Sequence, residues 1–256
     1  MTVLLVDIGN TRIKWARLVD GRLSRSHAAV HSGWRATDYA RRLLGANPPE
    51  HALVSTVAGP KVNQALVTAV SRAGADTHFV TVPGHGGGVT VGYLEPWRLG
   101  VDRFVAAVGA HQLFAGVAVC VVGVGTAMTI DLVAADGRHR GGVIIPSPDL
   151  MVATLFSETN GIRRRAQGGA PGGTGLFGRS TRAGVIQGSR YAAAALIDRA
   201  VEEAAPLVGR RPLVVLTGGG AGVVRPLVQS ACVGVADLVL RGLAALAQSL
   251  PTGPRP

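Results

Sequence analysis

The chain has 256 residues, 47% of them hydrophobic, and a formal net charge of +11. This length and apolar content suffice for a large buried core, which excludes an intrinsically disordered protein. Because the cations are scattered arginines with one compact cluster at 163–165, and no nucleic-acid-binding motif accompanies them, we expect small anionic ligands and no nucleic-acid partner.

Three sequence features bear on location. The longest apolar run, 117–124, is much shorter than the ~20 residues of a membrane-spanning helix. The N-terminal run, 2–7, has the pattern of a strand and lacks the basic and cleavage-site regions of a secretory signal. Cys120 and Cys232 each stand in an apolar stretch, as buried reduced thiols do. We therefore expect a cytoplasmic protein without a membrane span or a disulfide framework.

The first half of the chain opens with three strand patterns and continues with alternating helices and strands. Strands are predicted at 2–8, 13–18, 23–30, 52–57 and 77–82, and helices at 37–44, 61–73 and 101–114. This order favours a mixed sheet with helices packed on it.

The second half repeats that opening in outline. Strands are predicted at 117–122, 128–133, 142–145 and 213–216, and helices at 150–158, 182–207 and 238–250. The repeated strand–turn–strand–turn–strand order indicates an internal duplication. We predict an α/β protein with two related domains, 1–115 and 116–256, and a cleft between them of the kind that usually holds a ligand. The glycine-rich segment 168–178 is expected to be a mobile surface loop.

The segment Asp7-Ile8-Gly9-Asn10-Thr11 ends the first strand in a tight turn. Phosphate groups need backbone N–H groups at close approach and hydroxyl or amide donors, and this turn offers both. Asp7 ends an apolar run, where a carboxylate is costly unless something pairs with it, and a Mg²⁺ ion is such a partner. An ordinary β-turn is the alternative for this segment taken alone.

Two further glycine turns follow strands. The first, Val122-Gly123-Val124-Gly125-Thr126-Ala127, is a candidate second phosphate loop or an ordinary hairpin. The second, Leu216-Thr217-Gly218-Gly219-Gly220, would let the backbone approach a phosphate or a flat ligand, although glycines also end strands for structural reasons.

In this order the three turns resemble the phosphate-1, phosphate-2 and adenosine signatures of the actin-like ATPase superfamily. The segment 92–103, with the pattern Gly-Tyr-x-x-Pro-x-x-Leu-Gly-Val-Asp-Arg, resembles the pantothenate-site signature of the type III pantothenate kinases. The segments 141–146 and 180–181 resemble two more segments of that family, and the resemblance runs from about Leu4 to Leu246.

The resemblance implies two ribonuclease-H-like domains, of the actin-like ATPase type, that phosphorylate pantothenate with ATP in the first step of coenzyme A biosynthesis. It implies Mg²⁺, a monovalent cation (K⁺ or NH₄⁺) and a homodimer, and it makes Asp102 the general base. The implied substrate-binding residues are Tyr93, Gly100, Val101, Asp102, Arg103 and Thr181. The implied ATP-binding residues are Asp7, Ile8, Gly9, Asn10, Thr11, Arg12, Ile13, Lys14 and Thr126, with Asp7 positioning Mg²⁺ directly or through water.

Two positions depart from the family pattern. Many members carry Asp, a monovalent-cation ligand, at the position of Gly123, so we expect a weaker or altered potassium dependence. Ser147 stands where the family has glycine; if this turn needs a positive φ, serine is strained there and the pocket is altered.

Three other functions stay open at this point. The first is a kinase for a sugar or small acid. The second is a degenerate homologue that acts as a non-catalytic accessory or regulatory factor, and the third is an ATPase without an acceptor substrate. The segment 92–103 argues against the first. The carboxylate of Asp102 argues against the second, although taken singly it is also a common charge for a helix N-terminus.

Overall fold

The computed structural model describes residues 2–45, 48–167 and 175–249. Most of the expected loop at 168–178 therefore lies outside the described residues. The chain divides into two compact units: unit 1 holds Met1–Ala115, Gly137–His139 and Asp237–Pro256, and unit 2 holds Gly116–Asp136 and Arg140–Ala236. The first break falls at the predicted 115/116 boundary, whereas the C-terminal segment groups with unit 1. In the described ranges no helix combines the length and apolarity needed to cross a bilayer.

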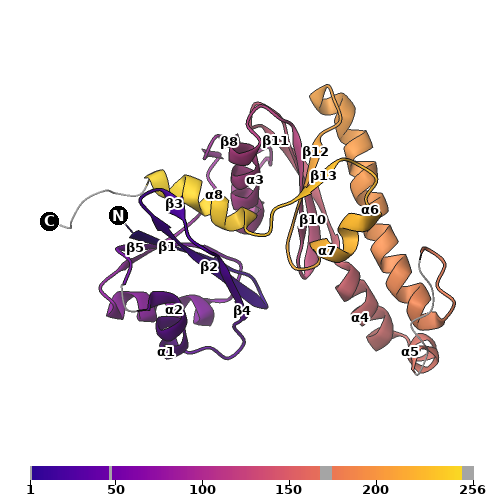
Figure 1. Ribbon diagram of the computed structural model, residues 1–256, viewed down its shortest axis with the longest axis horizontal. Helices are drawn as coiled ribbons and strands as arrows, with labels where there is room; N and C mark the ends of the chain where they lie inside the picture. The colour runs from indigo at the N-terminus through magenta and orange to yellow at the C-terminus, as the bar shows by residue number, and fades with distance from the viewer. Residues whose placement is uncertain (1, 46–47, 168–174, 250–256) are drawn as a thin grey trace. The chain divides into compact units, whose positions relative to one another are not determined.

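Unit 1 is built on a six-stranded mixed sheet (Figure 1). Its strands are β1 (Thr2–Ile8), β2 (Arg12–Val19), β3 (Arg22–Leu23), β4 (His27–Val30), β5 (His51–Thr56) and β6 (Asp76–Phe79). Their order is β3-β2-β1-β5-β6, with β4 also paired to β2. Strand β1 is antiparallel to β2 and parallel to β5, and it is apolar almost throughout because helices cover both of its faces.

Helices pack on both faces of this sheet. One face carries α1 (Ala36–Tyr39), which continues as the π-helical η1 (Ala40–Leu44), and α2 (Pro60–Arg72), over a core that includes Leu4, Val6 and Ile8. The opposite face carries α3 (Val101–Leu113) and α8 (Leu238–Leu246), the yellow helix in Figure 1, which is followed by η4 (Ala247–Ser249). Unit 1 also holds β7 (His85–Gly86), β8 (Val89–Thr90) and η2 (Pro96–Arg98).

Unit 2 has a five-stranded mixed sheet of order β11-β10-β9-β12-β13. The strands are β9 (Val119–Val124), β10 (Ala127–Val133), β11 (His139–Pro146), β12 (Leu213–Thr217) and β13 (Cys232–Gly234), and the first residue of β11 groups with unit 1. The helices are α4 (Pro148–Glu158), α5 (Asn160–Ala166), α6 (Thr181–Val208), α7 (Ala221–Val224) and η3 (Arg225–Leu227). The core joins α6 to the sheet through Ala193, Ile197 and Val201.

The two sheets share a pairing plan. In each, the first strand is antiparallel to the second and parallel to the first strand that follows the helices after the opening strands: β1 with β2 and β5, and β9 with β10 and β12. This repetition is what the predicted internal duplication requires.

Several local predictions differ from the structure. The strand predicted at 23–30 is two strands, because Ser24 Oγ accepts a hydrogen bond from Arg17 N (2.9 Å) and replaces a backbone acceptor there. Helix α5 and the short β7, β8 and β13 were not predicted, since elements of this length carry little periodicity. Cys120 is buried as expected, but Cys232 is only half-buried; both are free thiols.

Candidate active site

Three strands of unit 1 bring polar side chains together at the end of β1. Asp7 pairs with Lys14 on β2 and with Ser55 on β5. Paired residues on neighbouring strands project to the same face of a sheet, so these three side chains share one face. Because side chains alternate along β1, this is the face opposite Leu4, Val6 and Ile8, and it is the face that α3 covers.

The carboxyl group of Asp7 has an unusual proton affinity. Burial, and after it the neighbouring Asp102 carboxylate, raise its pKa to about 7, while Lys14 and the Ser55 hydroxyl act in the opposite direction. Ser55 is fully buried, and its Oγ makes no hydrogen bond of normal geometry with the described residues although it lies close enough to Asp7 to lower the pKa. Two adjacent carboxylates and a buried hydroxyl form a set of hard oxygen donors, which fits Mg²⁺.

The turn after β1 presents its side chains to solvent. Gly9 N donates a hydrogen bond to Arg12 O (2.9 Å), and the side chains of Asn10, Thr11 and Arg12 are exposed. The carbonyl oxygen of Gly9 lies 2.8 Å from Nε2 of the buried His31, which fixes the turn from β4. Gly9 does not have a positive φ, and a Cβ there would meet only Arg12 O at 3.4 Å, so glycine leaves this surface open rather than relieving strain.

Asp102 lies in the first turn of α3. Its negative charge acts on the Asp7 carboxyl group and raises the pKa of that group. Its Oδ1 accepts a hydrogen bond from Arg103 N (2.9 Å). Gly100, the N-cap residue, makes room for this carboxylate, since a Cβ at position 100 would lie 2.8 Å from Asp102 Oδ1. The carboxylate of the predicted base therefore depends on the absence of a side chain two residues earlier.

Replacing Gly100 by Ala should displace the Asp102 carboxylate without unfolding α3. The φ of Gly100 is −57°, which alanine adopts easily, so the melting temperature should change little. Displacing a reacting group by ~1 Å can reduce a rate about 100-fold, so we expect kcat to fall between about 10- and 100-fold. Gly59→Ala is the matched control, because Gly59 is the N-cap of α2 and has open space around it. An unchanged kcat in Gly100→Ala would contradict this role.

Arg103 holds a second predicted substrate residue in place. Arg103 is 7% exposed, and its Nη1 donates a hydrogen bond to Tyr93 Oη (3.0 Å). The guanidinium carbon lies 5.7 Å from the centre of the Tyr93 ring. Tyr93 also contacts the ring of His139, and the two ring centres are 5.7 Å apart. Gly92 N donates a hydrogen bond to His139 Nδ1 (3.4 Å). Tyr93 itself stays partly exposed.

The predicted residues of unit 2 lie at strand ends and helix starts. Thr126 is exposed in the β9–β10 turn, and its carbonyl accepts a hydrogen bond from Ser147 N (3.3 Å). Gly123 lies in β9 between Thr129 on β10 and Thr217 on β12. Thr181 is the first residue of α6, and Ser180 is the N-cap of that helix. The hydroxyl of Ser180 accepts a hydrogen bond from Ala183 N (3.1 Å).

The structure bears on two open points about unit 2. Ser147 has φ −65°, and its hydroxyl caps α4 by accepting from Leu150 N (3.2 Å), so the expected strain is absent. Gly218 has a positive φ and packs on β9, where a Cβ would lie 2.3 Å from Val124 O. The first of the three late glycines is thus needed for packing, while Gly219 has open space around it.

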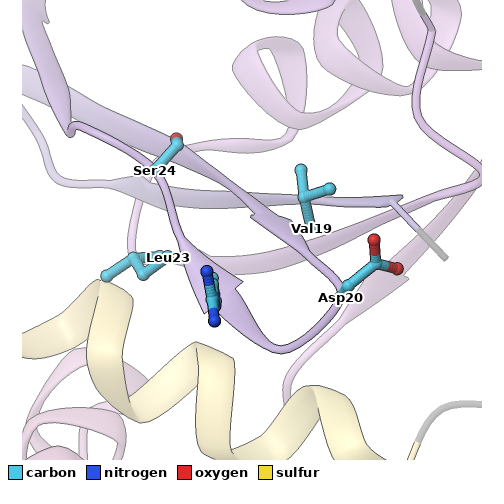
Figure 2. Close-up of a pocket in the computed structure, with 5 residues that line it drawn as sticks. Val19, Asp20, Leu23 and Ser24 are labelled. Atoms are coloured by element: carbon cyan, nitrogen blue, oxygen red, sulfur yellow. The ribbon is translucent and has the colours of Figure 1, made fainter.

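An open hollow elsewhere in unit 1 lies apart from these residues. It is lined by Val19, Asp20, Arg22, Leu23 and Ser24 around the β2–β3 turn (Figure 2). On the β1–β2 ladder Val19 pairs with Thr2, at the opposite end from the Asp7–Lys14 pair. We assign no role in phosphoryl transfer to this hollow.

Three residues near the site were not singled out from the sequence: His31, Ser55 and His139. Ser55 becomes visible only through the β1–β5 register, and His139 is 46 positions from Tyr93. No local pattern marks either residue. His31 follows a predicted strand, and its contact with Gly9 depends on the fold of β4 against β2.

Solved structures define the class of fold. The chain is similar to component A of the (R)-2-hydroxyglutaryl-CoA dehydratase of Acidaminococcus fermentans, with a TM-score of 0.55 and 12% identity over 96% of both chains. It is also similar to a ROK family glucokinase from Streptomyces griseus, solved with glucose and AMPPNP, with a TM-score of 0.53 and 14% identity over 97% of this chain and 99% of the other. The fold is that of the actin-like ATPases.

The sequence comparisons identify the family within this class. The profile of the type III pantothenate kinases matches residues 3–203. A type III pantothenate kinase of Nitrosococcus oceani is 36% identical over 96% of this chain and 94% of its own, and one of Herminiimonas arsenicoxydans is 37% identical over 98% and 99%. The chain belongs to the type III pantothenate kinase family, and the resemblance found in the motifs is confirmed.

Proposed function

We propose that this chain transfers the γ-phosphoryl group of ATP to the primary hydroxyl of pantothenate. The observation that carries the proposal is the meeting of Asp7 and Asp102 beside the exposed turn of Asn10 and Thr11, in a chain of this family. Phosphoryl transfer depends mainly on positioning and charge neutralisation. The turn and Asp102 would supply the positioning, and a Mg²⁺ ion held by Asp7 would supply the neutralisation.

The nucleotide side of the site is the turn between β1 and β2. Amide groups of the turn and the side chains of Asn10, Thr11 and Arg12 would bind phosphate oxygens. Asp7 would hold Mg²⁺ directly or through water, and the ion would neutralise charge on the phosphates. Because the pKa of Asp7 is about 7 without the ion, a proton competes with Mg²⁺ for this carboxylate near neutral pH.

On the acceptor side Asp102 is the general base. A carboxylate oxygen of Asp102 takes the proton of the pantothenate hydroxyl as the hydroxyl oxygen attacks the γ-phosphorus. A new P–O bond forms, the bond to the bridging oxygen of ADP breaks, and its electron pair leaves with ADP. Tyr93, oriented by Arg103, would line the pantothenate pocket. The ligand roles of Thr126 and Thr181, the homodimer and the cytoplasmic location stay predictions.

Identification of the product tests this proposal. The protein would be incubated with Mg-ATP and, in separate reactions, pantothenate, glucose, glycerol or no acceptor, and the products analysed by mass spectrometry and ³¹P NMR. We expect phosphopantothenate from pantothenate alone. A phosphorylated sugar, or ADP formed equally in every reaction, would instead identify another kinase or an ATPase.

The potassium dependence should follow from Gly123. Glycine offers no side-chain oxygen, so activity should change little when K⁺ replaces an inert cation at constant ionic strength. Gly123→Asp should create a saturable K⁺ requirement, with Thr129 shifting because a Cβ at position 123 meets its Oγ1 at 3.0 Å. Gly123→Ala is the control that adds the Cβ without an oxygen ligand. A steep, saturable requirement in the unmodified protein would contradict this prediction.

A further inference from the structure

A group of metal-ligating side chains lies at the beginning of two strands in unit 1. His51 is the first residue of β5, Asp76 is the first residue of β6, and His78 follows two positions later. The parallel register pairs His51 with Asp76 and Leu53 with His78. Since alternate residues share a face, all three side chains project to the same side of the sheet. One ligand atom from each lies within 4.8 Å of the others.

The separation of the two imidazoles fits a shared ion. His51 Nδ1 and His78 Nε2 are 3.3 Å apart, and the rings are tilted by 57° with centres 5.2 Å apart. Two ligands at the usual Zn–N distance of about 2.0–2.1 Å, placed at tetrahedral angles, are also separated by about 3.3 Å. Each neutral ring can present a lone pair at the facing nitrogen by carrying its proton on the other nitrogen.

Access and donor type narrow the class of ion. All three residues are half-buried, so they are held by the strands and remain reachable from solvent. Two imidazoles and one carboxylate suit Zn²⁺, Co²⁺, Ni²⁺ or Cu²⁺, whereas Mg²⁺ prefers oxygen ligands only. The group is also separate from the candidate active site, because His51 and Ser55 are four positions apart on β5, or about 13 Å along the strand.

We propose that His51, Asp76 and His78 form a binding site for one divalent transition-metal ion such as Zn²⁺, with water completing the coordination. The ion joins the starts of β5 and β6, which are hydrogen-bonded neighbours at the edge of the sheet. It therefore stabilises unit 1 and takes no part in phosphoryl transfer.

The test uses the full-length chain without a histidine tag, freed of metal with EDTA. Titration with Co²⁺ should give the intense visible absorption of a low-symmetry four- or five-coordinate ion, and calorimetry with Zn²⁺ should give one ion per chain. His78→Asn and, separately, Asp76→Asn should weaken binding of Zn²⁺ by at least about 10-fold. His27→Gln is the matched control, because His27 is an exposed histidine on β4 outside the group.

Thermal unfolding gives a second measurement that does not depend on activity. Zn²⁺ at ~100 times its dissociation constant should raise the melting temperature of the unmodified chain by about 5 °C or more. Circular dichroism shows whether each variant is folded. Zn²⁺ affinity in folded His78→Asn and Asp76→Asn equal to that of His27→Gln would overturn the proposal, as would the absence of one-to-one binding in the unmodified chain.

Discussion

Asp102→Asn is expected to lower kcat for pantothenate phosphorylation by about 100- to 10,000-fold, the usual contribution of a general base. Asparagine keeps the size of the side chain and can still accept the hydrogen bond from Arg103 N, so α3 should begin as before. The loss should appear in kcat more than in KM, because proton transfer occurs only as the reaction proceeds. Coupled ADP release at saturating ATP and pantothenate measures it.

Asp149→Asn is the control for Asp102→Asn. Asp149 is also an acidic residue in the first turn of a helix, α4, and is exposed. Both substitutions remove a charge that a helix N-terminus favours, which is worth about 0.3–1 kcal/mol. Loss of kcat only in Asp102→Asn, with both variants folded, separates the general base from a helix charge. Equal kcat in the two variants would refute the assignment of the base.

The second large effect concerns Asp7→Asn, which we expect to raise the stability of the protein and to lower its activity. The pKa of Asp7 is about 7 in the folded protein against 3.8 as the ordinary value, so ionised Asp7 destabilises the ligand-free fold. Each pKa unit corresponds to about 1.4 kcal/mol, and we expect Asp7→Asn to gain about 1–3 kcal/mol at about pH 8 while losing kinase activity.

The pH dependence of Asp7→Asn follows from the sign of that shift. Above the folded pKa of about 7 the carboxylate is ionised and the destabilisation is complete. As the pH falls through 7 towards 3.8 the folded state takes up its proton, and below 3.8 both states are protonated, so the difference between wild type and variant disappears. Chemical denaturation across this range is the measurement. A variant less stable than wild type at about pH 8 would contradict the raised pKa.

The strands and turns that carry the motifs can be predicted from the sequence. β1, its turn and the start of α3 lie where the apolar runs and glycines predicted them, because these patterns are local. The meeting of Asp7 and Asp102 was implied only through the family, since it depends on which face of β1 receives α3. Side-chain alternation along β1 shows that Asp7 faces away from Leu4, Val6 and Ile8. Sequence periodicity alone does not show which helix packs on each of the two faces.

Two local features are explained by contacts that the sequence pattern does not contain. Strain at Ser147 would require a positive φ, but the backbone there is extended and serine serves as a helix cap. Of the two interpretations of the triple glycine after β12, the structural one accounts for Gly218, which is required by its contact with Val124 O. In both cases the residue type marks a position with a special backbone role. The contact that explains the residue lies in the following helix for Ser147 and in β9 for Gly218.

The most direct test of the central claim is ADP release with Mg-ATP and K⁺, with and without pantothenate, for the unmodified protein and Asp102→Asn. Our account predicts turnover that requires pantothenate and that nearly disappears in the variant. ADP release that is indifferent to pantothenate, or a folded protein without turnover in either K⁺ or NH₄⁺, would contradict it.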